Sequence, residues 1–517
     1  MGESSLYKKG SEDFEKERLI GESLRENKRS KADEKLEANE QLHKNEQPAQ
    51  NNGSKRSHEF NGKKDINENE LFKTPSSKNL DFLKQEAELF DHIGPRAREI
   101  IEQDCSAVSA CIARPYPLVA DTAKGSIITD VDGREYIDFV AGIAVMNAGY
   151  SNPYVQAAVS SQLEKMIHCA YGDFFAELPV NLAKKLTELS GYSKVFYCNS
   201  GTEAVEAAIK LACWKTKRQG LVSFYNSFHG RTLGSLSLTC SKIRQKEHFP
   251  ALPAAHLHYA YCYRCPLKFE YPSCGIECAK ELENLIFRRV LSPEDTAAVF
   301  IEPVQGEGGY IVPPAEFHKE ISRICADNDV LLAADEVQAG CFRTGPFLAM
   351  KNSGVRADIT CLAKALGAGL PMGAMLADSK LMDWPAGVHS NTFGGNLLAS
   401  AASLASLEFL EQKKIENRVK ELGSSILSRL KELQQSFPFM GDVRGLGLMI
   451  GVEIVKPDQS VNPLLRDKII RGAFKEKILL LPCGDSVIRF SPPLIITDEE
   501  VENGLEKFES ALEKARL

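Results

Sequence analysis

The side chains best suited to chemistry in this chain follow short apolar runs. Lys364 comes just after the run Ile359–Leu362 and precedes a glycine-rich turn. Such a run is typical of a buried strand, so we expect the amine at its end to be partly desolvated. Desolvation lowers the pKa of a lysine and makes its neutral amine available as a nucleophile or for a Schiff base. Taken alone, a lysine in this position more often extends its amine to solvent, so its role depends on its neighbours.

A carboxylate and an amide follow the strand-like run LLAAD. Asp335 ends this run, and Gln338 comes three residues later. An isolated buried carboxylate is costly, so Asp335 must face a cation or a protonated ring nitrogen. A structural salt bridge satisfies Asp335 equally well. Gln338 can hydrogen-bond an oxygen of a ligand at the same place.

A turn of small polar residues, Asn199–Thr202, opens an alanine-rich helix that we expect over Glu203–Lys217. The backbone amides freed by Gly201, the hydroxyls of Ser200 and Thr202 and the positive helix end together suit a phosphate group. The alternative is an ordinary helix cap, which serine and threonine usually provide in this position.

The segment SFHGRT supplies an aromatic ring and a guanidinium just after another strand-like run. Phe228 can stack on a planar cofactor ring, and Arg231 can bind a carboxylate through two parallel hydrogen bonds. Core packing for Phe228 and a surface ion pair for Arg231 are the alternatives. Together with the lysine, the carboxylate and the phosphate-binding turn, these residues make the set that holds pyridoxal phosphate (PLP) and uses it as an electron sink.

These residues require a scaffold that brings strand ends together. From Lys194 onward, short apolar runs alternate with helix-like segments, and the expected strands are Val195–Cys198, Leu221–Tyr225, Thr296–Ile301, Val330–Ala334 and Ile359–Leu362. This alternation indicates an α/β fold with a parallel sheet that is covered on both faces. Ligands bind such sheets beyond the carboxyl ends of the strands. The residues that we expect there are Ser200, Phe228, Glu302, Asp335 and Lys364.

The flanking sequence indicates further units. Met1–Ser77 is rich in Glu, Lys, Asn, Ser and Gln, which predicts a disordered segment, and Leu80–Phe90 predicts a short amphipathic helix. A β-hairpin is expected around Asp132-Gly133. Further helices are expected over Pro95–Asp104, Pro153–Met166, Leu178–Leu189 and Ser400–Leu433. A smaller α+β domain is expected from Gly441–Val455, Ile478–Pro493 and a final helix to Leu517.

Residues from about Ile93 to the C-terminus resemble the class-III PLP-dependent aminotransferases of the ornithine and 4-aminobutyrate type, and the archaeal type in particular. Eight stretches match the motifs of that family, in the order of the family and over about four-fifths of the chain. They are NSGTEAVEAAIKLA, SFHGRT, IEPVQGEGGY, LLAADEVQAG with RTG, CLAKALGAGLPMGA, HSNTFGGN, VRGLGLMIGVE and IRFSPPLIIT.

The resemblance implies the PLP-dependent transferase fold type I. In that fold a large domain is built on a mostly parallel seven-stranded sheet, and a small α+β domain is built from both ends of the chain. The implied parts are a disordered charged extension over 1–85, a segment joining the small domain over 86–150, the large PLP-binding domain over 151–396 and the C-terminal small domain over 397–517. The resemblance also implies a homodimer, or a dimer of dimers, with active sites at the subunit interface.

The resemblance assigns cofactor roles motif by motif. Lys364 forms the Schiff base and moves the proton, Asp335 pairs with the pyridine nitrogen, and Gln338 contacts the phenolic oxygen of the ring. Phe228 stacks on the ring. The other implied cofactor-binding residues are His229, the phosphate-binding Ser200, Gly201 and Thr202, and Thr392 from the neighbouring subunit.

The same resemblance assigns the substrate contacts. Arg489 binds the α-carboxylate of a keto acid such as 2-oxoglutarate, and Arg231 binds its distal carboxylate. Glu307 resembles the glutamate that neutralises this second arginine when an ω-amino donor lacks an α-carboxylate. The implied reaction moves an amino group from an ω-amino acid, of the 4-aminobutyrate or ornithine type, to 2-oxoglutarate.

Two other functions fit parts of the same pattern. Some archaeal-type members of the family racemise amino acids, and racemisation differs only in where the substrate carbanion is reprotonated. A non-catalytic scaffold is largely excluded by the intact Lys364 and Asp335. Asp173, in AYGDFF, is either a contact for a distal ammonium, which favours ornithine- or lysine-like substrates, or a helix cap.

The chain has 14 cysteines and lacks a secretory signal, which favours reduced thiols over a disulfide framework. Four of them, Cys262, Cys265, Cys274 and Cys278, have the spacing C-x2-C-x8-C-x3-C. Such a set can hold a structural zinc ion. A loop of reduced thiols or an oxidised pair is the preferred interpretation, so we predict no metal.

Composition is that of an ordinary soluble globular protein. The 517 residues are 43% hydrophobic and 26% charged, with a net charge of −7, so the basic stripe of a nucleic-acid-binding surface is not expected. No apolar run approaches the roughly 20 residues that a membrane helix requires. The first 30 residues lack the apolar core of a targeting peptide. We therefore expect a cytoplasmic enzyme whose partners are amino and keto acids.

Overall fold

A computed structural model of the chain describes Leu89 and residues 92–516. The predicted disordered extension over 1–85 lies outside these residues, and so does the predicted helix Leu80–Phe90 apart from Leu89. None of the described helices is long and apolar enough to cross a bilayer.

The largest sheet has seven strands, which are β4 (Lys194–Cys198), β5 (Gly220–Phe224), β6 (Ala254–Leu257), β7 (Thr296–Ile301), β8 (Leu331–Asp335), β9 (Ile359–Leu362) and β10 (Gly373–Ala377). They lie in the order β4-β10-β9-β8-β7-β5-β6. β10 is antiparallel to both of its neighbours, and the other neighbouring pairs are parallel. The mostly parallel seven-stranded sheet is therefore confirmed.

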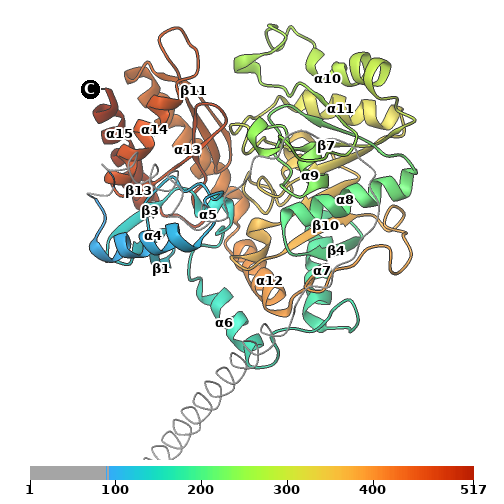
Figure 1. The fold of residues 1–517 in the computed structure, drawn as a ribbon, viewed down its shortest axis with the longest axis horizontal. Coiled ribbons are helices and arrows are strands. Elements are labelled where there is room, and N and C mark those ends of the chain that lie inside the picture. The colour runs from blue at the N-terminus through green and yellow to red at the C-terminus, as the bar shows by residue number, and fades with distance from the viewer. Residues whose placement is uncertain (1–88, 90–91, 517) are drawn as a thin grey trace, which may run out of the picture. The chain divides into compact units, whose positions relative to one another are not determined.

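Helices cover both faces of this sheet (Figure 1). Because side chains alternate along a strand, the fully buried β7 sends Phe300 to one face and Val299 and Ile301 to the other. Phe300 belongs to the core under helix α8 (Gly201–Thr216). Val299 and Ile301 belong to the core under α10 (Glu277–Glu281) and α11 (Ala315–Asp327). Burial on both faces explains why these strands are almost wholly apolar.

Two smaller sheets lie in the remainder of the described chain. One contains β1 (Ala120–Lys124), β2 (Ile127–Asp130), β3 (Glu135–Asp138) and β13 (Ile478–Leu479); the other contains β11 (Met440–Leu446), β12 (Met449–Ile454), β15 (Val487–Phe490) and β14 (Leu481–Cys483). The predicted hairpin is present as the antiparallel pair β2 and β3. β3 also pairs in parallel with β13, so segments near the two ends of the chain share one sheet.

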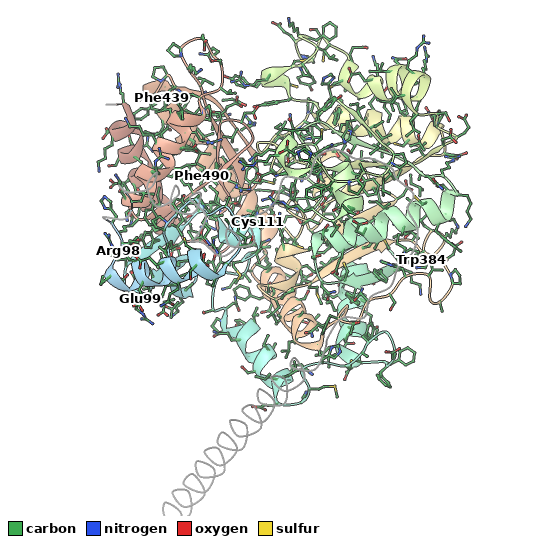
Figure 2. All side chains as sticks on the ribbon, viewed as in Figure 1. Arg98, Glu99, Cys111, Trp384, Phe439 and Phe490 are labelled. Atoms are coloured by element: carbon green, nitrogen blue, oxygen red, sulfur yellow. The ribbon has the colours of Figure 1, made fainter. Side chains whose placement is uncertain are left out.

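Aromatic side chains also pack between these segments from the two ends of the described chain. Phe490, labelled in Figure 2, lies edge-on to the rings of Phe139 and Phe508, with ring centroids 5.7 and 5.1 Å away. The helices of this region are α4 (Pro95–Ala107), α5 (Ala141–Ala144), α13 (Ile415–Ser436), α14 (Pro463–Lys475) and α15 (Asp498–Arg516). The first and last of these begin close to where the sequence predicts helices.

Four further α-helices lie in the described residues. They are α6 (Pro153–Leu163), α7 (Glu177–Ser190), α9 (Leu233–Leu238) and α12 (Leu397–Gln412). The helical stretch predicted over Ser400–Leu433 is two helices, α12 and α13, because Lys414 adopts a left-handed backbone conformation between them.

Candidate active site

The carboxyl ends of the central strands bring the predicted residues together. Asp335 ends β8, Glu302 directly follows β7, and Lys364 lies two residues beyond β9. The charged groups that act on the Lys364 amine are Arg489, Asp335, Glu302 and Glu307. Residues distant in the sequence therefore surround one lysine at the edge of the sheet, as parallel strands require.

Lys364 is held in a backbone conformation that lysine rarely adopts. Its φ is 48°, in the left-handed region, where it begins a short 3-10 turn. Residues in such conformations persist only where the surrounding structure fixes them, and they concentrate at functional sites. Burial, with a further contribution from Arg489, lowers the pKa of the Lys364 amine to about 8.

This pKa predicts how the cofactor-free protein captures PLP. The neutral amine is the reactive form, and its fraction rises as pH rises through the pKa. We expect the rate of PLP capture, followed by its absorbance after mixing, to rise with pH and reach half its maximum near pH 8. A midpoint near 10.5, the ordinary lysine value, would contradict the desolvated environment.

Asp335 has one charged partner among the described residues, and it is a histidine. The Asp335 Oδ2 and His229 Nδ1 atoms are 2.8 Å apart, and both side chains are buried. Burial alone would lower the pKa of His229, but the hydrogen bond and charge of Asp335 raise it overall. Asp335 Oδ1 also accepts a hydrogen bond from the Val337 N–H. The alternative role of Asp335, a structural salt bridge, is therefore present in part: one oxygen of its carboxylate pairs with His229.

Glu302 is a second buried carboxylate of this cluster. Its Oε2 accepts a hydrogen bond from the Phe228 N–H and its Oε1 accepts one from the Gly306 N–H, both at 3.0 Å. Burial raises the pKa of Glu302 to about 7, while His229 opposes this rise and Asp335 adds to it. Sequence placed Glu302 at a strand end but gave it no role. The signal was a carboxylate directly after a fully apolar strand, the same signal that identified Asp335.

The predicted phosphate turn has the expected form. Ser200 is the N-cap of α8, and its Oγ accepts a hydrogen bond from the Glu203 N–H. The cap interpretation is therefore correct, and it leaves the N–H groups of Gly201 and Thr202 without an acceptor inside the helix. A Cβ on Gly201 would lie 2.8 Å from the side chain of Val337, so only glycine fits there.

The Thr202 hydroxyl belongs to a polar cluster that the sequence analysis missed. Its Oγ1 lies 2.6 Å from the hydroxyls of both Thr232 and Ser235. Glu206 accepts hydrogen bonds from the Thr232 hydroxyl and the Ser235 N–H. These contacts fix the segment after Phe228 against the first turn of α8.

Gln338 contacts Tyr310, a residue without a predicted role. Gln338 Nε2 donates to the Tyr310 hydroxyl at 3.2 Å, and Tyr310 is fully buried. A Cβ on Gly306 would lie 1.9 Å from Gln338 Oε1, so the glycine-rich segment after Glu302 passes directly over this amide. The close approach requires glycine at position 306.

The predicted substrate arginines differ in their surroundings. Arg489 is buried on β15, and its NH1 lies 3.5 Å from Glu307 Oε2. The other oxygen of Glu307 lies 3.2 Å from the Lys242 ammonium. Arg231 is exposed, with its guanidinium 5.9 Å from the centre of the Phe228 ring. The predicted pairing of Glu307 with Arg231 is therefore wrong: Glu307 pairs with Arg489, which its strand brings to the glycine-rich segment.

Two other predicted contacts lie apart from the cluster. Thr392 is exposed, next to Phe393, which is 57% exposed. Asp173 is exposed in a turn and does not cap the following helix, whose N-cap residue is Ala176.

The four closely spaced cysteines line one small cavity. Burial, together with the charges of the other three, raises the pKa of Cys278 to about 12, so its thiol is neutral at pH 7. All 14 cysteines are free thiols in the part of the chain that is described. In that same part, no group of three or more His, Cys, Asp or Glu side chains could hold a metal ion. The absence of a metal stays a prediction.

The arrangement fits the shape and charge of PLP. The first turn of α8 offers free N–H groups to a phosphate, and Val337 places this turn beside the segment from Asp335 to Gln338. The His229 Nε2 atom is buried with no hydrogen-bond partner among the described residues. The half-buried Lys364 and Phe228 complete the surroundings of such a ring.

A sequence profile of the class-III aminotransferases matches residues 108–512. The chain belongs to this family. It is therefore a PLP-dependent transaminase of fold type I, as the sequence motifs predicted.

The relatives of this aminotransferase include more than one activity. It is 37% identical over 424 residues to the leucine/methionine racemase of Thermococcus litoralis, covering 81% of this chain and 96% of that protein. It is 38% identical over 412 residues to the acetylornithine aminotransferase of Methanosarcina mazei, covering 80% of this chain and 96% of that protein. The solved ornithine aminotransferase of Toxoplasma gondii, which holds PLP at partial occupancy, matches with a TM-score of 0.73 and 28% identity, covering 85% and 98% of the two chains.

Proposed function

We propose that this aminotransferase moves the amino group of an ω-amino acid, of the 4-aminobutyrate or ornithine type, to 2-oxoglutarate. The observation that carries the proposal is the ion pair between Glu307 and the buried Arg489. A transaminase must accept a dicarboxylate in one half-reaction and a different amino donor in the other. Arg489 can serve both half-reactions if Glu307 is displaced when a carboxylate binds. When the amino donor brings no carboxylate to Arg489, Glu307 neutralises the guanidinium instead.

The protein residues then divide the work around PLP. Bound PLP supplies the electron sink for the carbanion that forms on the substrate. Lys364 attaches the cofactor, and its Nζ takes the proton from the amino-bearing carbon; a pKa of about 8 suits a base at neutral pH. Asp335 keeps a proton on the ring nitrogen, and His229 holds the Asp335 carboxylate in place.

The remaining contacts hold the cofactor and the keto acid. Gln338 hydrogen-bonds the phenolic oxygen, and Phe228 stacks on the ring, held by the bond from its N–H to Glu302. Arg489 binds the α-carboxylate of 2-oxoglutarate and Arg231 binds the distal one. The phosphate is bound by Ser200, Gly201 and Thr202, and by Thr392 of a second copy of the chain.

The homodimer is part of this proposal, since Thr392 lies apart from Lys364 in one chain. Exposed aromatic side chains occur here: Phe393, next to Thr392 in the sequence, is 57% exposed with its ring 5.2 Å from the His168 ring, and Phe174 and Phe175 are 66% and fully exposed. Exposed apolar surface of this kind marks interaction sites. Light scattering coupled to gel filtration measures the mass directly, and a monomer would count against the assignment of Thr392.

The Glu307→Gln variant tests the switch. Without its charge, residue 307 cannot neutralise Arg489, so an ω-amino donor leaves a buried cation unpaired. We expect the KM for 4-aminobutyrate or ornithine to rise about tenfold, with the KM for 2-oxoglutarate unchanged or lower. Steady-state kinetics on both substrates measures this, and an equal change in both values would contradict the switch.

A racemase is the second candidate, supported by the 37% identity to the leucine/methionine racemase of Thermococcus litoralis. One assay separates the two. Purified holoenzyme is given single amino acids with and without 2-oxoglutarate. Glutamate formation that requires 2-oxoglutarate supports the transaminase, and loss of optical rotation without any keto acid supports the racemase. Glutamate formation with α-amino donors alone would overturn the ω-amino preference.

A further inference from the structure

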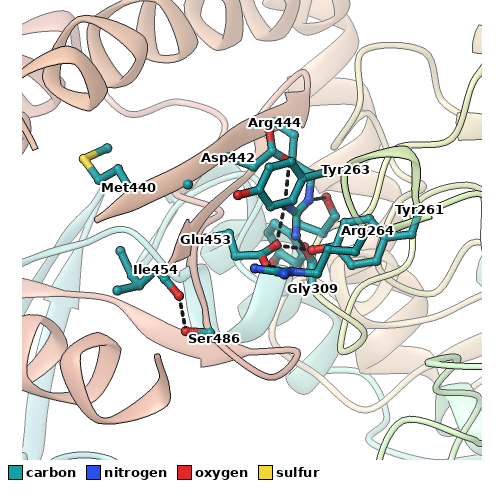
Figure 3. Close-up of polar contacts among 12 residues, drawn as sticks. Tyr261, Tyr263, Arg264, Gly309, Met440, Asp442, Arg444, Glu453, Ile454 and Ser486 are labelled. Carbon is teal, nitrogen blue, oxygen red and sulfur yellow. Dashed lines mark hydrogen bonds and ion pairs between the residues drawn. The ribbon is translucent and has the colours of Figure 1, made fainter. Parts of the chain in front are cut away.

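A buried ionic cluster contacts the segment that follows Glu307 (Figure 3). Glu453, on β12, is 1% exposed and accepts hydrogen bonds from Arg264, Arg444 and the Tyr261 hydroxyl. Arg444, on the neighbouring strand β11, also pairs with Asp442 at 2.7 Å. Two guanidinium groups and two carboxylates therefore balance one another in a largely desolvated place, where the loss of one partner is costly.

The cluster reaches the active site through Arg444. Its NH2 donates to the Gly309 carbonyl at 2.7 Å, and its Nε donates to the Tyr310 carbonyl at 3.2 Å. These carbonyls come two and three residues after Glu307 in the chain. Arg444 thus fixes the segment that carries Glu307, from outside the set of residues that surround Lys364.

The segment that Arg444 holds carries two of the groups that act on Arg489. Glu307 is its ion-pair partner at 3.5 Å, and the Tyr310 phenol contributes to the net rise in its pKa, against the lowering effect of burial. Tyr310 has a φ of 49°, a left-handed conformation that needs support from its surroundings. The two hydrogen bonds from Arg444 supply such support, because they hold the carbonyls of the two peptide bonds that flank the Tyr310 Cα.

Arg264 and Tyr261 join the cluster from the cysteine-bearing segment. Both bond to Glu453, and the Arg444 guanidinium lies 4.9 Å from the centre of the Tyr261 ring. Burial lowers the pKa of Arg444, but Tyr261, Asp442 and Glu453 raise it overall, so the guanidinium stays charged. The segment that begins at Tyr261 therefore contacts both Glu453 and Arg444.

We infer that Arg444 is a positioning residue that holds Glu307 in place to pair with Arg489. Arg264, acting through Glu453, links the segment that carries Cys262, Cys265, Cys274 and Cys278 to the choice between ω-amino donors and dicarboxylic acceptors. The inference rests on the proposed role of Glu307 and Arg489 in substrate choice. Only arginine suits position 444, since its planar fork bonds two carboxylates and two carbonyls at once.

The experiment compares Arg444→Lys and Arg264→Met in the full-length holoenzyme, each alone and combined with Glu307→Gln. Lysine keeps the charge at 444 but not the fork. Arg264 is partly exposed, and Glu453 keeps Arg444 and Tyr261 as partners when Arg264 is replaced. Arg429→Met is the matched control, because it removes an arginine that pairs with a glutamate, Glu509, at 2.7 Å on the surface.

Each single variant is expected to raise the KM for 4-aminobutyrate or ornithine about tenfold, with kcat changed less than about twofold and the KM for 2-oxoglutarate not raised. The absorbance of bound PLP stays as in the parent. In the Glu307→Gln background neither change has a further effect, because both act through Glu307. The Arg429→Met control leaves both KM values unchanged.

Three results overturn the inference. One is a full effect of Arg264→Met or Arg444→Lys in the Glu307→Gln background. Another is a parallel rise of both KM values with a lower melting temperature, which marks general structural damage. The third is normal kinetics in both variants while Glu307→Gln alone shifts the donor KM; the proposed function then survives. If Glu307→Gln has no effect either, the switch in the proposed function fails as well.

Discussion

Replacing Lys364 with alanine is expected to lower amino-group transfer by about 10⁴-fold, the upper end of what one positioned proton-transfer group contributes. The variant loses both the amine that attaches PLP and the base that moves the proton. It should also lose the visible absorbance that the parent shows when PLP is attached. The fold should survive, because the half-buried side chain has charged neighbours but lies outside the apolar core clusters.

Two further measurements make the Lys364 prediction specific. Borohydride treatment of the parent, followed by peptide mass spectrometry, should find the mass of the cofactor on the peptide that contains Lys364. Lys194→Ala is a matched control, since Lys194 begins β4 and is exposed. A Lys364→Ala protein that keeps the visible band would show that another lysine holds the cofactor.

Replacing Asp335 with asparagine is expected to slow amino-group transfer by about 10²–10³-fold, the loss that follows when one preorganised electrostatic contact is removed. The neutral amide cannot keep a proton on the ring nitrogen, so negative charge on the substrate carbon is no longer drawn into the ring. Because the Asp335 charge also raises the pKa of His229, that pKa should fall in the variant. Histidine NMR of parent and variant measures the second effect independently of activity.

Asp358→Asn is the matched control for Asp335→Asn. Asp358 lies just before β9, at the opposite edge of the same sheet, where its Oδ2 accepts a hydrogen bond from the Leu332 N–H at 2.8 Å. The same chemical change there should leave the kinetics near those of the parent. Equal losses of rate in the two variants would mean that Asp335 acts through stability and not through the ring nitrogen.

The apolar runs in the sequence correctly predicted most strands of the central sheet. β7 and β9 have the predicted bounds, and β4, β5 and β8 differ by one residue at one or both ends. The agreement is close because strands that are buried on both faces consist of almost unbroken apolar runs. β10 was missed. Its sequence, GAMLA, directly follows the glycine-rich turn and so resembles a continuation of that turn. Its antiparallel direction depends on the path of the chain, which local sequence does not encode.

The site was predictable where a strand end carries a charge. Asp335 and Lys364 could be found in this way, and Glu302 gave the same signal. The partner of Glu307 could not be found, since which arginine lies nearby depends on how β15 approaches the glycine-rich segment. Tyr310 was missed because a tyrosine after two glycines has no distinctive spacing, and its importance comes from the contact with Gln338.

The pairing of β3 with β13 has a consequence for folding during synthesis on the ribosome. Ile137 and Ile478 are partners in that sheet, so about 340 residues must be synthesised after β3 before its neighbour β13 is present. At about 5–20 residues per second, the edge of the nascent sheet stays open for about 20–70 seconds. An open edge is a template for pairing with other chains, so the growing polypeptide is exposed to aggregation during that interval. A strand near the end of the chain, β13, thus completes a sheet whose other strands lie near the start of the described residues.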